Sequence, residues 1–240
     1  LDTGRVTRIA EHQHPRQPRG IVPLFEAAVR KRMPRADQPM GIFLSGGLDS
    51  SIVAAMASRL RDDIAYYTLG DKDGPDRRAG KTVVDALGLK DVREVQIPSS
   101  ASIPDLLRAV VYATESYNPS IVSNGLGTYL LAQAAHKDGI KVVLTGEGAD
   151  ELFGGYHSFS EHDPWREVRA QLLNDMQFTE LRRLDMSCMA HGVEARCPFL
   201  DQAVRGFSDR LSYDEMYSGD GNKITLRKRF GGLLPTEILD

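Results

Sequence analysis

The stretch MGIFLSGGLDSS at residues 40–51 decides the fold of this chain. Its apolar beginning at 40–44 predicts a short buried strand, and the small residues at 45–47 break that strand. A helix is predicted to follow from residue 51 to residue 60. Gly46 and Gly47 let the backbone turn where side chains would obstruct it. A strand, a tight turn and a helix N-terminus in this order form an arrangement that binds anions.

The alternation of strands and helices continues outward from this stretch. Further strands are predicted at 64–69, 92–97 and 141–145, and helices at 21–33, 77–87, 103–114 and 126–138. Strands that alternate with helices at this spacing indicate an α/β fold with a parallel, doubly wound sheet covered on both faces.

The chain divides into an arm and one domain. Residues 1–20 are polar, contain prolines, and are predicted to form a linker or arm. Residues 21–240 are predicted to form the domain, with a sheet part over about 21–155 and a helical part over about 156–240. No strand is predicted after residue 155. Helices predicted at 165–173, 179–190, 200–211 and 223–230 form helical additions packed on the sheet.

The composition excludes several classes of function. The 30 Lys and Arg residues against 33 Asp and Glu give a net charge of −3, so no basic excess exists for a nucleic acid or an anionic membrane. The longest apolar runs, such as KVVLT at 141–145, are far shorter than the roughly 20 residues that span a bilayer. Cys188 and Cys197 have no metal-ligand spacing. Two cysteines in a chain of this size indicate a reducing, cytoplasmic setting.

Asp49 is the informative residue of the first turn. The hydroxyls of Ser45, Ser50 and Ser51 lie beside the amides of a helix N-terminus, as an anion site requires. A carboxylate among them would repel a phosphate unless a cation lies between the two, which indicates Mg²⁺. Neither a Walker A loop nor a dinucleotide fingerprint is present. The alternative is a generic strand-to-helix turn of small residues.

A second turn, TGEGADELFGGY at 145–156, follows the strand predicted at 141–145. It carries Glu147, Asp150 and Glu151 within five residues, a cluster that is costly unless a cation or a substrate compensates it. The carboxyl ends of strands in a doubly wound sheet meet at the ligand crevice. If the strands at 40–44 and 141–145 are neighbours, Asp49 and Asp150 can therefore share one metal ion. The alternative is a solvated acidic loop.

Together with two later motifs, these turns resemble the synthetase domain of glutamine-dependent asparagine synthetases, within the PP-loop ATP pyrophosphatases. The later motifs are HGVEARCPFLD at 191–201, and KxxLR with LPTEIL over 223–239. The resemblance runs from about residue 21 to residue 240. It implies a sheet of the adenine-nucleotide α-hydrolase type with helical additions at its C-terminal end.

The resemblance also implies site residues. The pyrophosphate cradle would be Ser45, Gly46, Gly47, Leu48, Asp49 and Ser50, and the adenosine site Leu44, Leu69, Gly70, Thr145 and Gly146. Mg²⁺ would bind Asp49 and Asp150, and the acceptor would bind Glu115, Tyr117, Asp150 and Glu151. The catalytic acid or base would be Glu147. Related β-lactam synthetases carry a tyrosine there, so Glu147 favours an intermolecular amide former over a ring closer.

The implied cofactors are ATP and Mg²⁺, and the implied reaction makes an amide. A carboxylate, aspartate or an analogue, would attack the α-phosphorus of ATP and release pyrophosphate. Ammonia or an amine would then attack the acyl-adenylate and lose a proton to Glu147, giving the amide and AMP. The implied partners are these small molecules, with a glutaminase domain or subunit. A homodimer is left open.

Several features depart from the family pattern. No cysteine precedes Cys188, so the nucleophile of a glutaminase domain is expected outside this chain. Ser123 stands where an arginine is frequent, and Arg77 and Arg78 stand where acids are frequent. The catalytic lysine of the family is expected beyond Asp240, and Lys223 belongs to a different, upstream element.

These departures keep two alternatives open: a specialised amide synthetase of a biosynthetic pathway, and a non-catalytic nucleotide-binding scaffold. Glu194, Arg196 and Asp201 are predicted to form a structural ion network around a turn.

Overall fold

The computed structural model describes residues 20–70, 74–160, 164–219 and 221–239. The arm predicted over 1–20 lies outside the described residues except for Gly20, as do residues 71–73 of the loop that precedes Arg77.

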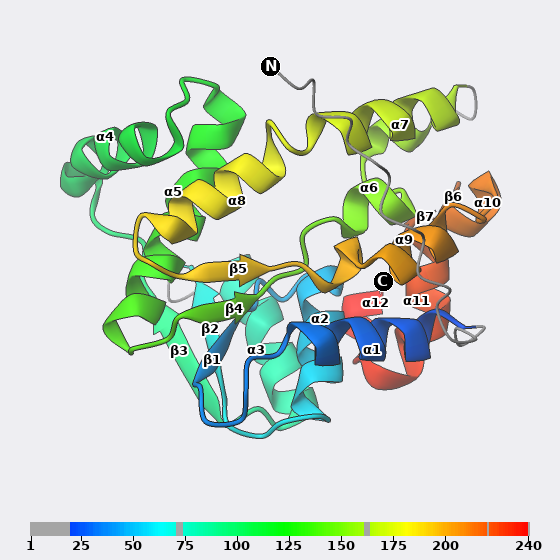
Figure 1. Cartoon of the computed structure of the whole chain (residues 1–240), viewed down its shortest axis with the longest axis horizontal. Coiled ribbons are helices and arrows are strands. Elements are labelled where there is room, and N and C mark those ends of the chain that lie inside the picture. The colour runs from blue at the N-terminus through cyan, green and yellow to red at the C-terminus, as the bar shows by residue number, and fades with distance from the viewer. Residues whose placement is uncertain (1–19, 71–73, 161–163, 220, 240) are drawn as a thin grey trace, which may run out of the picture.

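Five parallel strands form the central sheet, in the order β3-β2-β1-β4-β5 (Figure 1). They are β1 (Met40–Phe43), β2 (Ile64–Leu69), β3 (Asp91–Val95), β4 (Val142–Leu144) and β5 (Glu194–Arg196). Strand β1 pairs with β2 on one side, where Met40 faces Ile64, and with β4 on the other, where Gly41 faces Val143. The two strands that precede the glycine-rich turns are therefore neighbours, and the strand order reverses between them. Such a reversal is where ligands bind in sheets of this kind.

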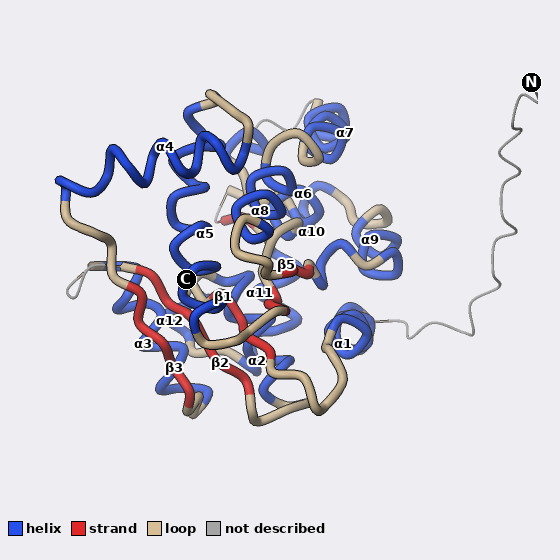
Figure 2. The backbone as a smooth tube through the Cα atoms, turned by 60° about the vertical axis from the view of Figure 1, so that its left-hand side comes forward, coloured by secondary structure: helices blue, strands red, loops and turns tan. Residues whose placement is uncertain are grey.

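Helices cover both faces of the sheet (Figures 1 and 2). The larger helices are α1 (Ile21–Arg32), α2 (Leu48–Ser58), α3 (Pro75–Leu87), α4 (Ile103–Thr114), α5 (Pro119–Lys137), α7 (Trp165–Asp175) and α8 (Glu180–Met189). Shorter helices are α6 (Ala149–Phe153), α9 (Gln202–Ser208), α10 (Tyr213–Met216), α11 (Ile224–Phe230) and α12 (Thr236–Leu239). Within the described residues, 3-10 turns lie at Ser100–Ser102, His157–Ser160, Pro198–Leu200 and Gly231–Leu233.

Two apolar cores separate the helices from the sheet. The larger core packs α1, α2, α9 and α11 together around residues such as Phe25, Ile52 and Phe230. The smaller core lies between the sheet and helices α5 and α8, and it contains Tyr67 and Leu184. Strands β1 and β4 are buried along their whole length, because each has a strand on both sides and helices on both faces.

The fold confirms the predicted α/β class and parallel sheet, but the prediction of no strand after residue 155 is wrong. Strand β5 pairs in parallel with β4, with Val142 facing Glu194. A small antiparallel hairpin, β6 (Tyr217–Ser218) with β7 (Gly221–Asn222), follows later. Both are two or three residues long and carry polar residues. Such short polar strands lack the apolar periodicity that identifies a strand in sequence.

Several helix boundaries also differ from the prediction. Helix α2 begins at Leu48, directly after the glycines, rather than at residue 51. Helix α5 begins at Pro119 rather than at 126, because the Asn118 side chain accepts a hydrogen bond from the Ser120 amide and caps the helix. The helix predicted at 200–211 is the shorter α9, which Asp201 caps in the same way.

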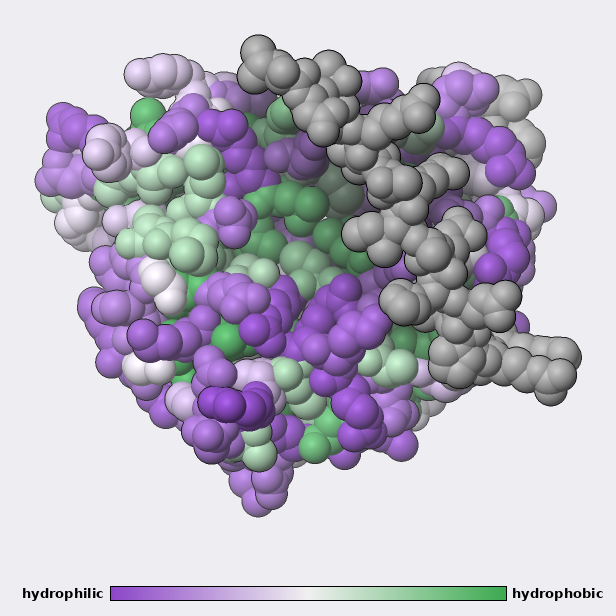
Figure 3. All heavy atoms as spheres, in the orientation of Figure 1, coloured by the Kyte–Doolittle hydropathy of each residue, from purple (hydrophilic) through white to green (hydrophobic). Residues whose placement is uncertain are grey.

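The surface matches the near-neutral, charge-rich composition. On the face shown in Figure 3, hydrophilic residues form most of the rim, and hydrophobic residues gather in a recessed centre. Among the described residues, no helix has the length and apolar character needed to cross a bilayer.

Candidate active site

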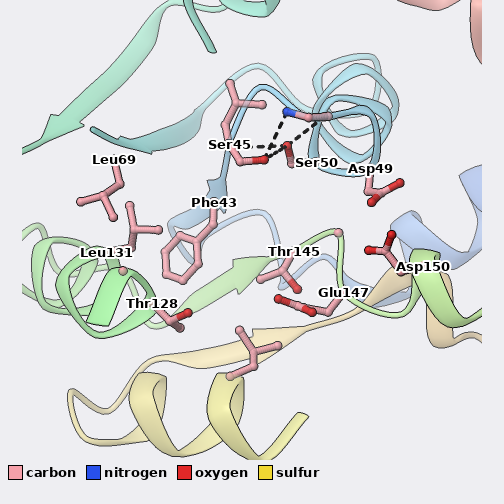
Figure 4. A pocket seen from close by; sticks show the side chains of 15 residues that line it. Phe43, Ser45, Asp49, Ser50, Leu69, Thr128, Leu131, Thr145, Glu147 and Asp150 are labelled. Atoms are coloured by element: carbon pink, nitrogen blue, oxygen red, sulfur yellow. Dashed lines mark hydrogen bonds between the residues drawn. The ribbon is translucent and has the colours of Figure 1, made fainter. Parts of the chain in front are cut away.

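The two glycine-rich turns meet at the carboxyl ends of β1 and β4, where they border a cavity of about 330 Å³ (Figure 4). Predicted residues on its wall are Leu44, Ser45, Gly47, Asp49, Ser50, Leu69, Thr145, Gly146, Glu147 and Asp150. Phe43, Leu131 and Leu184 complete an apolar side of the cavity. One cavity therefore combines hydroxyls and amides, carboxylates and an apolar wall.

Hydrogen bonds hold the first turn in shape. The Ser45 and Ser50 hydroxyl oxygens lie 2.9 Å apart, and the Gly47 amide donates to the Ser45 hydroxyl at 3.2 Å. The Ser51 hydroxyl donates to the Gly47 carbonyl at 2.7 Å. Gly46 takes a φ of 83° and packs against the backbone of α3. These contacts fix the turn in front of the N-terminus of α2, whose unpaired amides and dipole favour anions.

The second turn lies directly against the first. A Cβ at Gly146 would come within 2.9 Å of the Ser50 amide nitrogen and of the Asp49 Cβ. The absence of a side chain at Gly146 therefore allows the close approach of the two turns. As a result the carboxylates of Asp49 and Asp150 face one another (Figure 4).

Lys223 lies between these two carboxylates. Its Nζ is 2.5 Å from Asp49 Oδ2 and 2.7 Å from Asp150 Oδ1, and its side chain is 8 % exposed. Burial by itself would lower the pKa of Lys223, but the two carboxylates outweigh burial and raise it. The KxxLR motif that contains Lys223 does not by itself predict this position. It lies far from both turns along the chain, and no local pattern links them.

The carboxylate pair fits a divalent cation. Asp49 Oδ1 is buried without a hydrogen-bond partner, and burial raises the pKa of Asp49 to about 6, although Lys223 opposes that shift. No group of three or more metal-binding side chains converges anywhere in the described part of the chain. Mg²⁺ is commonly bound by one or two carboxylates, with waters and substrate phosphates as its other ligands. Asp49 and Asp150 are the residues that would hold it here.

Glu147 lies on the cavity wall beside Arg183, a residue that no sequence motif predicts at the site. Arg183, on α8, donates from Nη2 to Glu147 Oε1 at 2.8 Å and from Nη1 to the Thr128 hydroxyl at 3.1 Å. The only sequence signal for Arg183 is its place on a predicted helix. Its contact with Glu147 depends on how α8 packs over α5 and β5.

Three of the four residues predicted to bind the acceptor lie away from the cavity wall. Glu151 is 2 % exposed and accepts a hydrogen bond from the Tyr156 hydroxyl at 2.6 Å, and burial raises its pKa. Glu115 and Tyr117 border a separate hollow between α4, α5 and α8. Their role toward an acceptor remains a prediction.

Three predicted nucleotide-binding residues do not border the cavity either. Gly46 forms the turn itself, Leu48 is buried at the start of α2, and Gly70 follows β2, where its amide donates to the Val95 carbonyl. Gly46 and Leu48 therefore shape and support the turn rather than line the cavity.

The predicted ion network around β5 is present as two ion-paired groups that are linked through Arg32. Arg196 pairs with Glu194 at 2.8 Å and donates to the Arg32 carbonyl. Asp201 accepts from Lys31 and Arg32, each at 2.8 Å. The network joins α1 to β5 and α9, so its role is structural.

The chain is similar in sequence to proteins named asparagine synthetases. The chain is 35 % identical over 229 residues to a glutamine-hydrolysing asparagine synthetase of Cricetulus griseus, covering 90 % of this chain and 40 % of that protein. It is 34 % identical over 231 residues to a probable glutamine-hydrolysing asparagine synthetase of Schizosaccharomyces pombe, covering 86 % and 41 %. The chain thus spans about two fifths of the length of these relatives.

A solved structure of the U34-tRNA thiolase NcsA of Methanococcus maripaludis matches with a TM-score of 0.40 and 14 % identity, covering 83 % of this chain and 84 % of that one. The family model for asparagine synthase matches residues 20–180 and 159–240. The chain belongs to the asparagine synthase family, whose members are carbon–nitrogen ligases that use ATP.

Proposed function

We propose that this domain uses ATP to convert a carboxylate into its acyl-adenylate and then transfers ammonia or an amine to it, forming an amide. The observation that carries the proposal is the pairing of Asp49 with Asp150 around one positive charge, beside an anion-binding turn. Membership of the asparagine synthase family supports it independently.

The cavity offers each part of ATP a suitable surface. The apolar side formed by Leu44, Leu69 and Leu131 suits the adenine, and the turn at 45–50 suits the phosphates. Mg²⁺, when bound by Asp49 and Asp150, would neutralise charge on the departing pyrophosphate. Lys223 Nζ pairs with Asp49 Oδ2 and Asp150 Oδ1, so it adds a positive charge beside the metal position and leaves Asp49 Oδ1 available to the metal.

The residues suit the two chemical steps. An oxygen of the acceptor carboxylate attacks the α-phosphorus, and the bond from that phosphorus to the pyrophosphate oxygen breaks. The amine nitrogen then attacks the acyl carbon, passes a proton to Glu147, and AMP leaves. The Arg183 guanidinium holds the Glu147 carboxylate in place at the cavity wall.

The finer assignments rest on resemblance and on the names of the relatives. We propose aspartate or an analogue as the acceptor. Glutamine is the proposed source of ammonia through a glutaminase domain or subunit, because the similar proteins are named glutamine-hydrolysing. Ser123, exposed at the position where the family often has arginine, leaves room for a different acceptor in a specialised pathway.

The proposed function is tested by pyrophosphate release from the full-length protein with MgATP and a panel of carboxylic acids. Glu147→Gln is expected to reduce amide formation by about 100-fold or more while leaving the affinity for ATP unchanged, because general-base catalysis contributes that much. Glu167→Gln, on the exposed side of α7, is the matched control and should be fully active.

Two outcomes would count against this proposal. If no acid elicits pyrophosphate release while ATP still binds, the domain is a nucleotide-binding scaffold. If Glu147→Gln unfolds the protein, Glu147 is structural rather than catalytic.

A further inference from the structure

The geometry points to Arg227 as a positioning residue that holds Lys223 between Asp49 and Asp150 and ties it to helix α12. Arg227 and Lys223 are the two ends of the KxxLR motif at the start of α11. The Lys223 side chain contacts the carboxylates of the candidate site, whereas the Arg227 side chain contacts Asn222, the residue before Lys223.

All three nitrogens of the Arg227 guanidinium donate to neighbouring chain. Nε donates to the Asn222 carbonyl at 2.8 Å, and Nη2 donates to the Asn222 side-chain oxygen at 3.0 Å. Nη1 donates to the Leu239 carbonyl at 2.6 Å, at the end of α12. One side chain thus fixes both the backbone and the side chain of the residue that precedes Lys223.

Lys223 needs such support because its backbone is unfavourable. Its φ is 51°, in the left-handed region that residues with a side chain rarely adopt. Conformations of this kind persist only where the surrounding structure determines them. Here the Asn222 side chain also donates to the Gly155 carbonyl at 2.8 Å, which fixes the corner against the second glycine-rich turn.

Gly155 shows how tightly the lysine is placed. A Cβ at this position would lie 1.8 Å from Asp150 Oδ1 and 2.4 Å from the Lys223 Cε. The Lys223 side chain therefore packs directly against the Gly155 backbone, with no space for an additional methyl group. A small rotation of the Asn222–Lys223 corner would withdraw Nζ from its partners.

The positioning of Lys223 stands on these contacts alone, and only its use toward phosphate rests on the proposed function. Because Arg227 also binds the Leu239 carbonyl, the end of α12 and the active-site lysine form one hydrogen-bonded unit. We expect a displacement of α12 to reach the site through Arg227.

The test is brief acetylation of the natural full-length protein with acetic anhydride, read at each lysine by mass spectrometry without nucleotide. Lys223 is protected because it is buried and ion-paired, whereas Lys31, with a side chain 68 % exposed, serves as the internal reference. Arg227→Met is expected to raise labelling of Lys223 relative to Lys31 by about tenfold or more, the effect of losing a hydrogen bond made by a charged group. Arg229→Met, exposed on the same helix, is the matched control and should leave the ratio unchanged.

A folded Arg227→Met protein whose Lys223 remains as protected as before would overturn the inference. If that variant does not fold, Arg227→Lys is used instead. A lysine ammonium cannot donate to all three acceptors of the Arg227 guanidinium, so labelling of Lys223 is expected to be intermediate. Equal protection in Arg227→Lys and the unaltered protein would likewise overturn it.

The affinity for MgATP, measured in parallel, separates this inference from the proposed function. Exposure of Lys223 with unchanged affinity would support the positioning role of Arg227 and contradict a role of Lys223 toward phosphate.

Discussion

At the scale of single residues, the site depends on a buried lysine held between two carboxylates, of which Asp49 has a side chain 18 % exposed and Asp150 one 36 % exposed. Asp49 and Asp150 share the Lys223 ammonium, and one oxygen of Asp49 has no hydrogen-bond partner. Removing one partner of a buried ion pair is strongly destabilising, while the intact pair adds little net stability. The arrangement is thus better explained by a function that uses these charges than by a contribution to folding.

Gly155→Ala tests the close packing of Lys223 and Asp150 against the Gly155 backbone. The new methyl group would overlap Asp150 Oδ1 and the Lys223 Cε, so the lysine must move away from the carboxylates. We expect a loss of about 1–3 kcal/mol in the free energy of unfolding, the usual cost of overpacking. Calorimetric titration should also show weaker binding of MgATP.

Gly206→Ala is the matched control for that variant. Gly206 lies in helix α9 with no atom within 4 Å of an added Cβ, so alanine there should be neutral or stabilising. A Gly155→Ala protein as stable as this control, with unchanged nucleotide affinity, would contradict the predicted clash.

At the scale of elements, α1 and α9 are joined through one buried carboxylate. The Asp201 side chain, 5 % exposed, pairs with Lys31 and Arg32 of α1 and caps α9 through the Ala203 amide. Although burial opposes it, hydrogen bonding to Lys31 and Arg32 lowers the pKa of Asp201 to about 2. Arg196 of β5 donates to the Arg32 carbonyl, so the clamp is also tied to the edge strand of the sheet.

The free energy of unfolding is expected to depend on pH through the ionisation of Asp201. The pKa of Asp201 is lower in the folded chain than the ordinary value of 3.8, so its stabilisation is complete above pH 3.8 and is lost as the pH falls toward 2. Asp201→Asn should lower the free energy of unfolding by about 2 kcal/mol at neutral pH and flatten the acid limb between those values. Urea unfolding from pH 2 to pH 7 measures both effects.

Asp37→Asn provides the comparison, because the Asp37 side chain is 76 % exposed and its contact with Arg35 is a surface ion pair. Little change is expected from it. If the free energy of unfolding falls equally between pH 3.8 and pH 2 in Asp201→Asn and in the unaltered protein, the predicted role of Asp201 is wrong.

At the scale of the whole molecule, the site joins distant parts of the chain. Asp49 follows β1, Asp150 follows β4, and Lys223 comes from the C-terminal helices. A ligand held by all three would bind only the folded chain. Ligands of this kind stabilise the folded state in proportion to the logarithm of their concentration.

MgATP at about 100 times its dissociation constant is expected to add about 2.7 kcal/mol to the free energy of unfolding. The melting curve should move to higher temperature as a single transition, because the site connects the sheet with the C-terminal helices. Asp150→Asn should remove most of this shift, and Asp214→Asn, exposed on α10, should retain it. A shift confined to one part of the chain, read by hydrogen exchange, would contradict a shared site.

The sequence by itself determined the parallel α/β sheet and the two glycine-rich turns, and it predicted that Asp49 and Asp150 meet if the strands before these turns are neighbours. These follow from local apolar runs, from glycines beside acids, and from the rule that parallel strands end at a common edge. Strand β5, the hairpin, Arg183 and Lys223 were decided only by the tertiary structure. Short polar strands carry no periodic signal, and a charge 174 positions away from Asp49 has no local pattern that reveals its partner. Such contacts form because burying an unpaired carboxylate is costly. The packed chain lowers this cost by placing a positive side chain beside the carboxylate, even when the two are far apart in sequence.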